Sequence, residues 1–281
     1  HLRNHHQITV LTRNPRHALQ SIGFDIHTLA SLQDLDSLDG FDAVINLAGE
    51  PIAQRWNERT RMLITNSRLL ITQQLVQLWR ASQRPPRILI SGSAIGYYGR
   101  QGSTAIDEHY TKVHPEFSHT LCKHWEELAL SLKDEARVCI LRTGIVLGQG
   151  GGALARMLPA FRLGLGGPIA SGEQYMSWIH IDDMLKAIRF LLEKEHVAGI
   201  FNLTAPYPVT NAQFSAALGK ALGRPAEMRV PARIMRWLFG EMADLLIHGQ
   251  RVVPKRLLDA GFHFGFAHID DALNHLFKAK K

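Results

Sequence analysis

The chain of 281 residues is 46% hydrophobic and 20% charged, which is typical of a globular protein large enough to bury a sizeable core. The formal net charge is +7, but the basic residues are scattered, so we expect no nucleic-acid partner. No apolar run approaches the roughly 20 residues that span a bilayer, and we expect no membrane partner. The two cysteines form no metal-binding or disulfide pattern, which favours a cytoplasmic protein.

Two short apolar runs near the start of the chain have the character of buried strands. Residues 8–11 and 43–47 are apolar and β-branched, and each run ends in polar or small residues. Residues 14–40 between them form a polar connection with one short strand near residues 24–27. Buried strands of this kind predict a parallel sheet with a ligand at its carboxyl edge.

The end of the first strand indicates which ligand. Thr12 and Arg13 stand there, with no acidic residue beside them. In dinucleotide-binding folds an acid at this point selects NAD, whereas an arginine accommodates the 2′-phosphate of NADP. We therefore expect NADP as the cofactor, with its adenosine phosphate at Thr12 and Arg13. The end of the second strand, Leu47, Ala48 and Gly49, should lie along the cofactor.

Helices and strands alternate through the middle of the chain. A long helix is expected from Asn57, which serves as its N-cap, to about residue 79. The pattern continues with a strand at 87–91, a helix at 117–132 and a strand at 138–142. This alternation predicts a Rossmann-type, doubly wound parallel α/β sheet.

The composition changes at Gly148, where glycine-rich segments typical of loops begin. Asp182 is the expected N-cap of one later helix. The further elements that we expect are one strand at 199–203 and helices at 153–161, 182–193, 211–222, 232–239 and from 270.

These elements divide the chain into two parts. Residues 1–148 are expected to form an NADP-binding Rossmann domain. Residues 149–281 supply the remainder of the sheet, at about 182–205, and a small, mostly helical cap on the substrate side. The glycine-rich phosphate loop that follows the first strand of a Rossmann fold is absent from the sequence, so we expect the complete protein to have roughly 15 to 25 additional residues that carry it.

Several long motifs resemble one known family. The chain is similar to atypical short-chain dehydrogenase/reductases, specifically the YfcH-type, epimerase-like NAD(P)-binding proteins. The resemblance covers essentially the whole sequence and rests on the segments 44–51, 91–99, 121–126, 141–148, 161–169 and 178–183.

The resemblance implies an unusual catalytic centre. In catalytic relatives a serine binds the substrate oxygen, a tyrosine transfers the proton, and a lysine four residues later lowers the pKa of that tyrosine. Ser93 fills the serine position, but Ser118 and Cys122 fill the tyrosine and lysine positions. The candidate catalytic residues are therefore Ser93 and Cys122.

Other residues near these positions are alternatives or supporting contacts. Tyr97, Tyr98 and Lys123 are alternative proton donors, although tyrosines in a strand loop more often serve packing. His180, Asp182 and Asp183 do not have the spacing of a known metal motif, and we interpret them as structural rather than as a metal site.

The resemblance also extends the expected cofactor site. Ser91 and Gly92, at the end of their strand, should contact the cofactor. Val146 should pack against the nicotinamide, and Arg68 replaces a family asparagine and is expected to contact the cofactor or a phosphate.

Two classes of function remain open. The first is an NADP(H)-dependent oxidoreductase or epimerase of a small, unknown substrate with a reorganised proton relay. The second is a cofactor-binding or redox-sensing protein without conventional turnover. The family name is not evidence of sugar chemistry, and the sequence does not indicate the oligomeric state.

Overall fold

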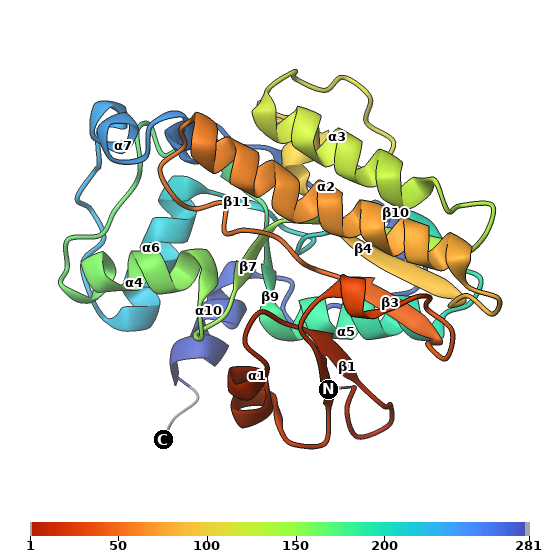
Figure 1. The fold of residues 1–281 in the computed structure, drawn as a ribbon. Helices are drawn as coiled ribbons and strands as arrows, with labels where there is room; N and C mark the ends of the chain where they lie inside the picture. The colour runs from red at the N-terminus through yellow and green to blue at the C-terminus, as the bar shows by residue number, and fades with distance from the viewer. Residues whose placement is uncertain (1, 279–281) are drawn as a thin grey trace.

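The computed structural model describes residues 2–278, and its centre is a four-stranded parallel sheet in the order β10-β6-β4-β3. The strands are β3 (Ala43–Asn46), β4 (Ile88–Ala94), β6 (Arg137–Thr143) and β10 (Gly199–Leu203). Two helices cover one face and a third covers the other (Figure 1); they are α2 (Glu58–Ala81) and α3 (Phe117–Leu130), and α5 (Ile181–Glu193). A parallel sheet covered on both faces is the doubly wound α/β fold that the sequence predicted.

The apolar strands explain this arrangement, because their residues alternate between two covered faces. Ile90 belongs to a buried cluster with Leu191 of α5. Leu89, its neighbour on β4, belongs to the cluster on the opposite face with Trp79 of α2 and Ala129 of α3. A strand that is buried on both faces reads as a continuous apolar run, and this is why β4 and β6 were found from the sequence.

The amino-terminal strands form a separate pair. β1 (Thr9–Leu11) and β2 (His27–Leu29) are parallel to each other and share no strand pairing with the central sheet. A cavity of about 520 Å³ lies between β1 and β3 and is lined by apolar residues of both strands, among them Val10 and Val44. The sheet is thus interrupted between β1 and β3 within the described residues.

The connection between β1 and β2 differs from the prediction. It contains a helix, α1 (Pro15–Ile22), where the sequence predicted only a polar connection. The following strand begins at His27, the last residue of the range predicted for it. The helix has only eight residues and buries only Ala18, which is too short a segment to be recognised from its apolar pattern, and its clearest signals are local: Asn14 caps it and Pro15 starts it.

Long helices were located more accurately. The side chain of Asn57 accepts a hydrogen bond from the Thr60 N–H at 2.8 Å, which confirms it as the N-cap of α2. The predicted cap of α5 was wrong by two residues. His180 caps this helix, and its Nδ1 accepts from the backbone N–H of Asp182 at 3.0 Å. Strand β9 (Trp178–His180) runs directly into α5, so the cap falls on the last residue of the strand.

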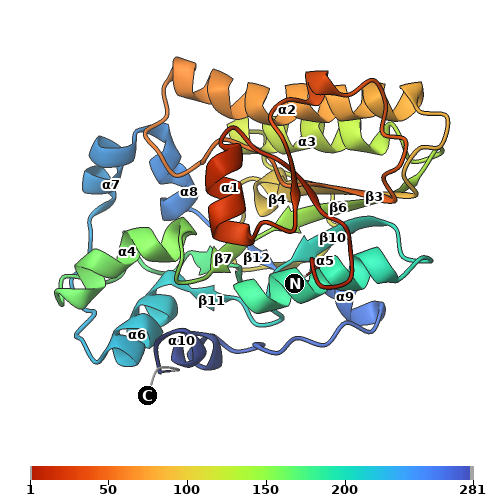
Figure 2. The ribbon, with the colours of Figure 1, turned by 60° about the horizontal axis from the view of Figure 1, so that its bottom comes forward.

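Four helices from the second half of the chain gather at one end of the molecule in both views (Figures 1 and 2): α4 (Gly152–Arg162), α6 (Asn211–Leu222), α7 (Ala232–Phe239) and α10 (Ile269–Lys278). Shorter helices occur along the chain at η1 (Leu32–Asp34), η2 (Ile95–Tyr98), η3 (Glu241–Ala243), α8 (Asp244–Ile247) and α9 (Lys255–Asp259). No helix among residues 2–278 is both long and apolar enough to cross a membrane.

Short strands connect this region to the sheet. Two of them, β7 (Ile145–Leu147) and β9 (Trp178–His180), pair in parallel. The others form the pairs β8 (Tyr175–Met176) with β11 (Val209–Thr210) and β5 (Ala105–Ile106) with β12 (Arg251–Val252). None of these two- and three-residue strands was predicted, because so short a segment shows no alternation.

Candidate cofactor and catalytic site

A row of polar residues crosses the sheet near its carboxyl edge. Ser93 on β4 pairs with Arg142 on β6, and Arg142 pairs with Asn202 on β10. All three side chains are buried, and Arg142 is only 2% exposed. Buried polar groups need partners, and this row obtains them from the helix above it and from the loop that follows β4.

The main partner is Glu126 of α3. The Arg142 guanidinium donates to both of its carboxylate oxygens, from Nε at 2.9 Å and from Nη2 at 2.7 Å. The Ser93 hydroxyl donates to the same carboxylate at 2.6 Å. Burial opposes the charge of Arg142, but the contacts with Glu126 and Tyr98 outweigh it and raise the pKa of the guanidinium. The charge of Arg142 is therefore permanent.

This network determines what Ser93 can do. A serine hydroxyl has one hydrogen, and in this arrangement Glu126 receives it. The oxygen of Ser93 can then accept a hydrogen bond from a ligand hydroxyl, which suits an alcohol better than a carbonyl substrate.

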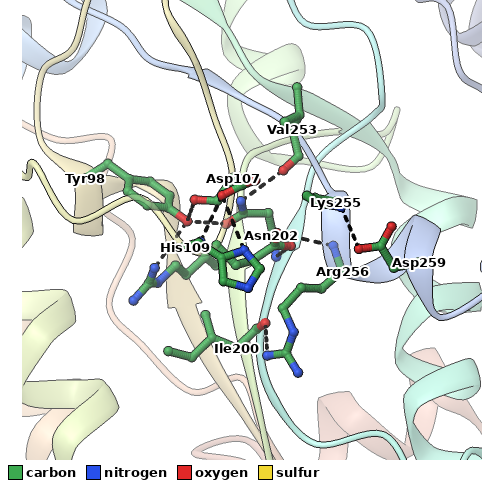
Figure 3. A network of polar contacts seen from close by, with 11 residues as sticks. Tyr98, Asp107, His109, Ile200, Asn202, Val253, Lys255, Arg256 and Asp259 are labelled. Atoms are coloured by element: carbon green, nitrogen blue, oxygen red, sulfur yellow. Dashed lines mark hydrogen bonds and ion pairs between the residues drawn. The ribbon is translucent and has the colours of Figure 1, made fainter.

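Tyr98 closes the network on the other side. Its hydroxyl accepts from Arg142 at 3.1 Å and donates to the Asn202 side chain at 2.8 Å. Figure 3 shows this residue beside Asn202, which itself donates to the Val253 carbonyl. Burial raises the pKa of Tyr98 to about 12. Tyr98 is therefore a structural residue, with its hydroxyl held by the protein.

The lysine position of the family holds a neutral thiol. Cys122 is buried, and desolvation together with the nearby Glu126 raises its pKa to about 12. Nucleophilic and metal-binding chemistry needs the thiolate, which this position disfavours near neutral pH. Lys123 does not replace the missing cation, since its half-exposed side chain faces Glu127 at 3.9 Å.

The tyrosine position is occupied by a buried serine. Ser118 donates to Glu116 at 2.6 Å. Tyr97 is half-buried, and its ring covers the guanidinium of Arg142, with the Cζ atom 3.3 Å from the ring centroid. Of the three alternative donors, Tyr97 alone lies beside the polar row without a hydroxyl contact to a described residue.

Gly92 and Ser91 lie inside the sheet. A Cβ on Gly92 would come within 2.9 Å of the Trp125 ring, so the missing side chain makes room for this tryptophan. The Trp125 indole N–H donates to Thr72, which also receives a hydrogen bond from Asn46, both at 3.0 Å. Ser91 is fully buried. The structure thus explains the glycine at position 92 by its contact with Trp125, and the cofactor contact of Ser91 and Gly92 stays a prediction.

The end of β3 brings several predicted residues together. Leu47 is half-exposed, and the Ala48 N–H donates to the side chain of Asn46 at 3.2 Å. Gly49 lies against the guanidinium of Arg68 from α2, whose Cζ atom would be 2.8 Å from a Cβ at this position. Arg68 therefore reaches the end of β3, and its contact with the cofactor or a phosphate stays a prediction.

The remaining predicted contacts lie at other strand ends. Arg13 is exposed between the end of β1 and the start of α1. The Thr12 hydroxyl accepts from the Asn14 N–H at 3.2 Å. Val146 lies half-buried on β7 and packs against the central core.

The histidine and aspartate cluster serves the fold. His180 Nδ1 accepts the α5 cap bond, so in a neutral ring Nε2 carries the hydrogen and donates to His275 at 3.2 Å. The ring also stacks on Phe266 at 3.9 Å between centroids. Asp183 accepts from the backbone N–H groups of Gly265 and Phe266. Both ring nitrogens of His180 thus have partners in the protein, and possible ligand atoms of His180, Asp182 and His275 lie within 4.8 Å of one another.

Sequence reasoning placed the strand end at Arg142 near the nicotinamide but did not predict the ion pair between Glu126 and Arg142. The signal was present, because Arg142 continues the apolar run of residues 138–141 inside a buried strand. A charge in such a place needs a buried partner of opposite sign. A carboxylate on a helix that covers the sheet, such as Glu126, was the obvious candidate.

A doubly wound sheet whose strand ends carry an exposed arginine, an Ala-Gly turn and a serine defines a dinucleotide-binding α/β protein. The chain belongs to the NAD dependent epimerase/dehydratase family, whose model matches residues 1–204. A domain of unknown function, DUF1731, matches residues 230–276, which include α7 and most of α10.

The relatives support this assignment over the whole chain. The human epimerase family protein SDR39U1 is 37% identical over 275 residues, 96% of this chain and 91% of the human protein. Its chloroplastic homologue from Arabidopsis thaliana is 36% identical over 276 residues, 96% of this chain and 79% of the plant protein.

Solved structures agree with the fold. The human epimerase family protein SDR39U1 (isoform 2), crystallised with NADPH, has a TM-score of 0.90 and 35% identity and covers 99% of this chain and 92% of its own. A UDP-glucuronic acid 4-epimerase from Bacillus cereus has a TM-score of 0.73 over 92% of this chain and 83% of its own. At 17% sequence identity, this likeness shows a shared fold and nothing about function.

Proposed function

We propose that this protein binds NADP(H) along the carboxyl edge of the sheet and uses it in hydride transfer with a small molecule, with NADPH as the reductant in a reduction and NADP⁺ as the oxidant in an oxidation or in the first half of an epimerisation. The observation that carries the proposal is the position of Arg13, exposed at the end of β1 beside the first turn of α1. An arginine there can pair with the 2′-phosphate that distinguishes NADPH from NADH. The human relative solved with NADPH supports the same cofactor.

The other contacts follow from the strand ends. Thr12 joins Arg13 at the adenosine phosphate, and Leu47, Ala48 and Gly49 follow the cofactor along its length. Ser91, Gly92 and Val146 belong to the same proposal. For Ser91 and Gly92 the backbone is the available contact, because the first side chain is buried and the second position has none.

The catalytic step is the less conventional part. Ser93 accepts a hydrogen bond from a substrate hydroxyl while its own hydroxyl donates to the Glu126 carboxylate at 2.6 Å. The protein acts on a small-molecule substrate, and two buried free cysteines are compatible with the reducing conditions of the cytoplasm.

A second candidate function is a non-catalytic NADPH-binding protein that senses redox state. The observation that favours it is the pair of neutral groups at Ser118 and Cys122, where related enzymes carry a proton donor and a cation. Both candidates require the same cofactor site, and they differ only in turnover.

Titration of the full-length protein with NADPH and NADH, followed by fluorescence, tests the cofactor proposal. We expect NADPH to bind at least 10-fold more tightly, and Arg13→Ala to remove most of the difference, because a charged hydrogen bond contributes about 1.5–3 kcal/mol. Arg59→Gln, an exposed arginine on the first turn of α2, is the matched control and should leave both affinities unchanged. Equal affinities for the two dinucleotides would contradict the proposal.

A further inference from the structure

The outer face of α7 is apolar and exposed to solvent. Ile234, Trp237 and Leu238 are 47%, 73% and 46% exposed, and their spacing of i, i+3 and i+4 places them on one side of the helix. The core uses a different side, where Met235 is buried and Phe239 packs against a buried cluster. α7 lies at the outer end of the molecule in both views (Figures 1 and 2). Single exposed apolar residues are ordinary, but three neighbours on one helix face indicate a contact surface.

Trp237 is the most exposed residue of this face. The chain has five tryptophans, and the other four are buried: Trp56, Trp79, Trp125 and Trp178. A solvent-exposed indole forgoes the favourable free energy of burying a large aromatic ring. Tryptophan is also among the residue types that dominate the binding energy of protein interfaces. Trp237 is therefore the expected anchor of a contact.

α7 is held in place by the segment that contains the start of α2. Arg55 Nη1 donates to the Trp237 carbonyl in the last turn of α7 at 2.9 Å. Just after the helix, Glu241 forms an ion pair with Arg61 of α2 at 2.7 Å. The apolar face thus belongs to a helix that is already ordered, and a partner does not have to order it.

The surroundings of this face are basic. Residues 55–61 and 224–244, which contain α7 and the segment that contacts it, include seven arginines and four acidic residues. Arg55, Arg229 and Arg233 are exposed, and none of them forms an ion pair with a carboxylate among residues 2–278. Arg233 lies four residues before Trp237, beside the apolar face. It is in the first turn of α7, where a cation opposes the helix dipole, so it does not stabilise the helix.

These charges favour one kind of occupant. A second copy of this chain would bring the same cations against each other, and each copy has a formal net charge of +7. A lipid surface suits a longer apolar face, because the eight residues of α7 extend only about 12 Å and expose three large apolar side chains. A protein groove that is apolar inside and bordered by carboxylates complements both the spacing and the charge of this face.

We propose that the outer face of α7 is a docking surface for a protein partner that presents such an acid-bordered apolar groove. Trp237 occupies the centre of the contact, Ile234 and Leu238 lie beside it, and Arg233 pairs with a carboxylate at the border. Grooves commonly recognise helices whose apolar residues recur at i, i+3 and i+4. The inference goes beyond the proposed function, because α7 carries none of the residues assigned to the cofactor or to catalysis.

A synthetic peptide serves as the minimal partner. An alanine-based peptide of about 18 residues, with leucines along one face and glutamates on both borders, is long enough to form a helix in water. A second peptide carries lysines in place of the glutamates. We expect the glutamate peptide to bind at least ~10-fold more tightly at low salt, as measured by fluorescence anisotropy of the labelled peptide, and added salt should reduce the difference. In fluorotryptophan-labelled protein, the resonance that Trp237→Phe removes should shift on binding.

Matched variants locate the contact on α7. Trp237→Ala should weaken binding of the glutamate peptide by ~10-fold or more, because it removes the anchor. Leu238→Ala should also weaken it, whereas Leu258→Ala on α9, where the leucine is equally exposed at 46%, should not. Arg233→Glu should weaken binding of the glutamate peptide and strengthen binding of the lysine peptide. Arg84→Glu, an exposed position beyond the opposite end of α2, should do neither. Thermal unfolding verifies that each variant is folded.

Three results would overturn the proposal. The first is equal binding of the two peptides, or binding that Trp237→Ala leaves unchanged. The second is a dimer in sedimentation velocity that Trp237→Ala dissociates, which would assign the face to a second copy of the chain. The third is binding to vesicles of phosphatidylcholine and phosphatidylglycerol that requires Trp237, without binding of the glutamate peptide, which would assign the face to a lipid surface.

Discussion

Ser93 and Glu126 lie 33 positions apart in the chain, and the hydroxyl of one donates to the carboxylate of the other across 2.6 Å. The contact joins the end of β4 to the middle of α3. The same carboxylate accepts hydrogen bonds from Nε and Nη2 of Arg142. The hydroxyl of the candidate catalytic serine is therefore oriented by a buried ion pair.

This ion pair makes a clear prediction about stability. Glu126→Gln or Arg142→Met should each lower the free energy of unfolding by about 3–5 kcal/mol, because each leaves a buried charge without its partner. The double variant should be less destabilised than the sum of the two singles. Urea unfolding measures all three. Lys123→Gln, which removes an exposed ion pair on the same helix, should cost less than about 1 kcal/mol and serves as the control.

Gly92 should not tolerate a methyl group. Gly92→Ala would place a Cβ 2.9 Å from Trp125, and overpacking of this kind costs about 1–3 kcal/mol. Gly102→Ala is the matched control, because no described atom lies within 4 Å of a Cβ there and its φ is not positive. Thermal unfolding of the two variants compares them. A Gly92→Ala protein as stable as Gly102→Ala would show that Trp125 can move away.

His180 predicts a pH dependence of stability. Burial lowers its pKa from the ordinary 6.5, so the unfolded chain takes up the proton first as the pH falls. The neutral His180 side chain therefore contributes fully to the free energy of unfolding above pH ~6.5, and this contribution is lost progressively below that value. His180→Asn keeps an acceptor for the N-cap of α5 and should flatten the stability profile between pH 6.5 and 5.

Denaturant unfolding at several pH values measures this slope. His109→Asn replaces an exposed histidine and should keep the slope of the unmodified protein. Equal slopes for the His180→Asn and unmodified proteins would mean that another group causes the acid sensitivity.

Turnover should be low with conventional substrates. A general acid contributes about 10²–10⁴ in rate, and Ser118 and Cys122 do not supply one. Nucleotide sugars, aldehydes and ketones should therefore be converted with NADPH at rates near background. Ser118→Tyr combined with Cys122→Lys should restore weak hydride transfer if the backbone geometry is retained.

An active unmodified protein would show where that reasoning fails. Rapid NADPH oxidation with a carbonyl substrate, abolished in Ser93→Ala, would mean that another residue donates the proton. Tyr97→Phe would be the first variant to examine, because the hydroxyls of Tyr98 and Ser118 are already held by the protein.

The sequence predicted those features that depend on long or local patterns. The long helix α2 and its cap at Asn57 followed from periodicity and capping, and β4 and β6 followed from their apolar runs. α1 was missed because it buries only one residue.

Contacts between distant segments were the part that the sequence could not give. The packing of Trp125 on Gly92 and the position of Gly49 beside Arg68 depend on how α2 and α3 lie across the sheet. A glycine at a strand end has the same sequence signature whether it admits a ligand or a neighbouring ring. Three-dimensional placement supplies the neighbour in each case, which is the Trp125 ring for Gly92 and the Arg68 guanidinium for Gly49.

The permanent charge of Arg142 has a consequence for kinetics. The guanidinium keeps its proton across the whole pH range in which the protein is folded, because its contacts with Glu126 raise its pKa. The electrostatic potential that it contributes beneath a bound ligand is therefore constant with pH. A bell-shaped profile of rate against pH would therefore arise from groups other than Arg142. Comparing the apparent pKa values of such a profile between the unmodified protein and Tyr97→Phe would test whether Tyr97 is the missing proton donor.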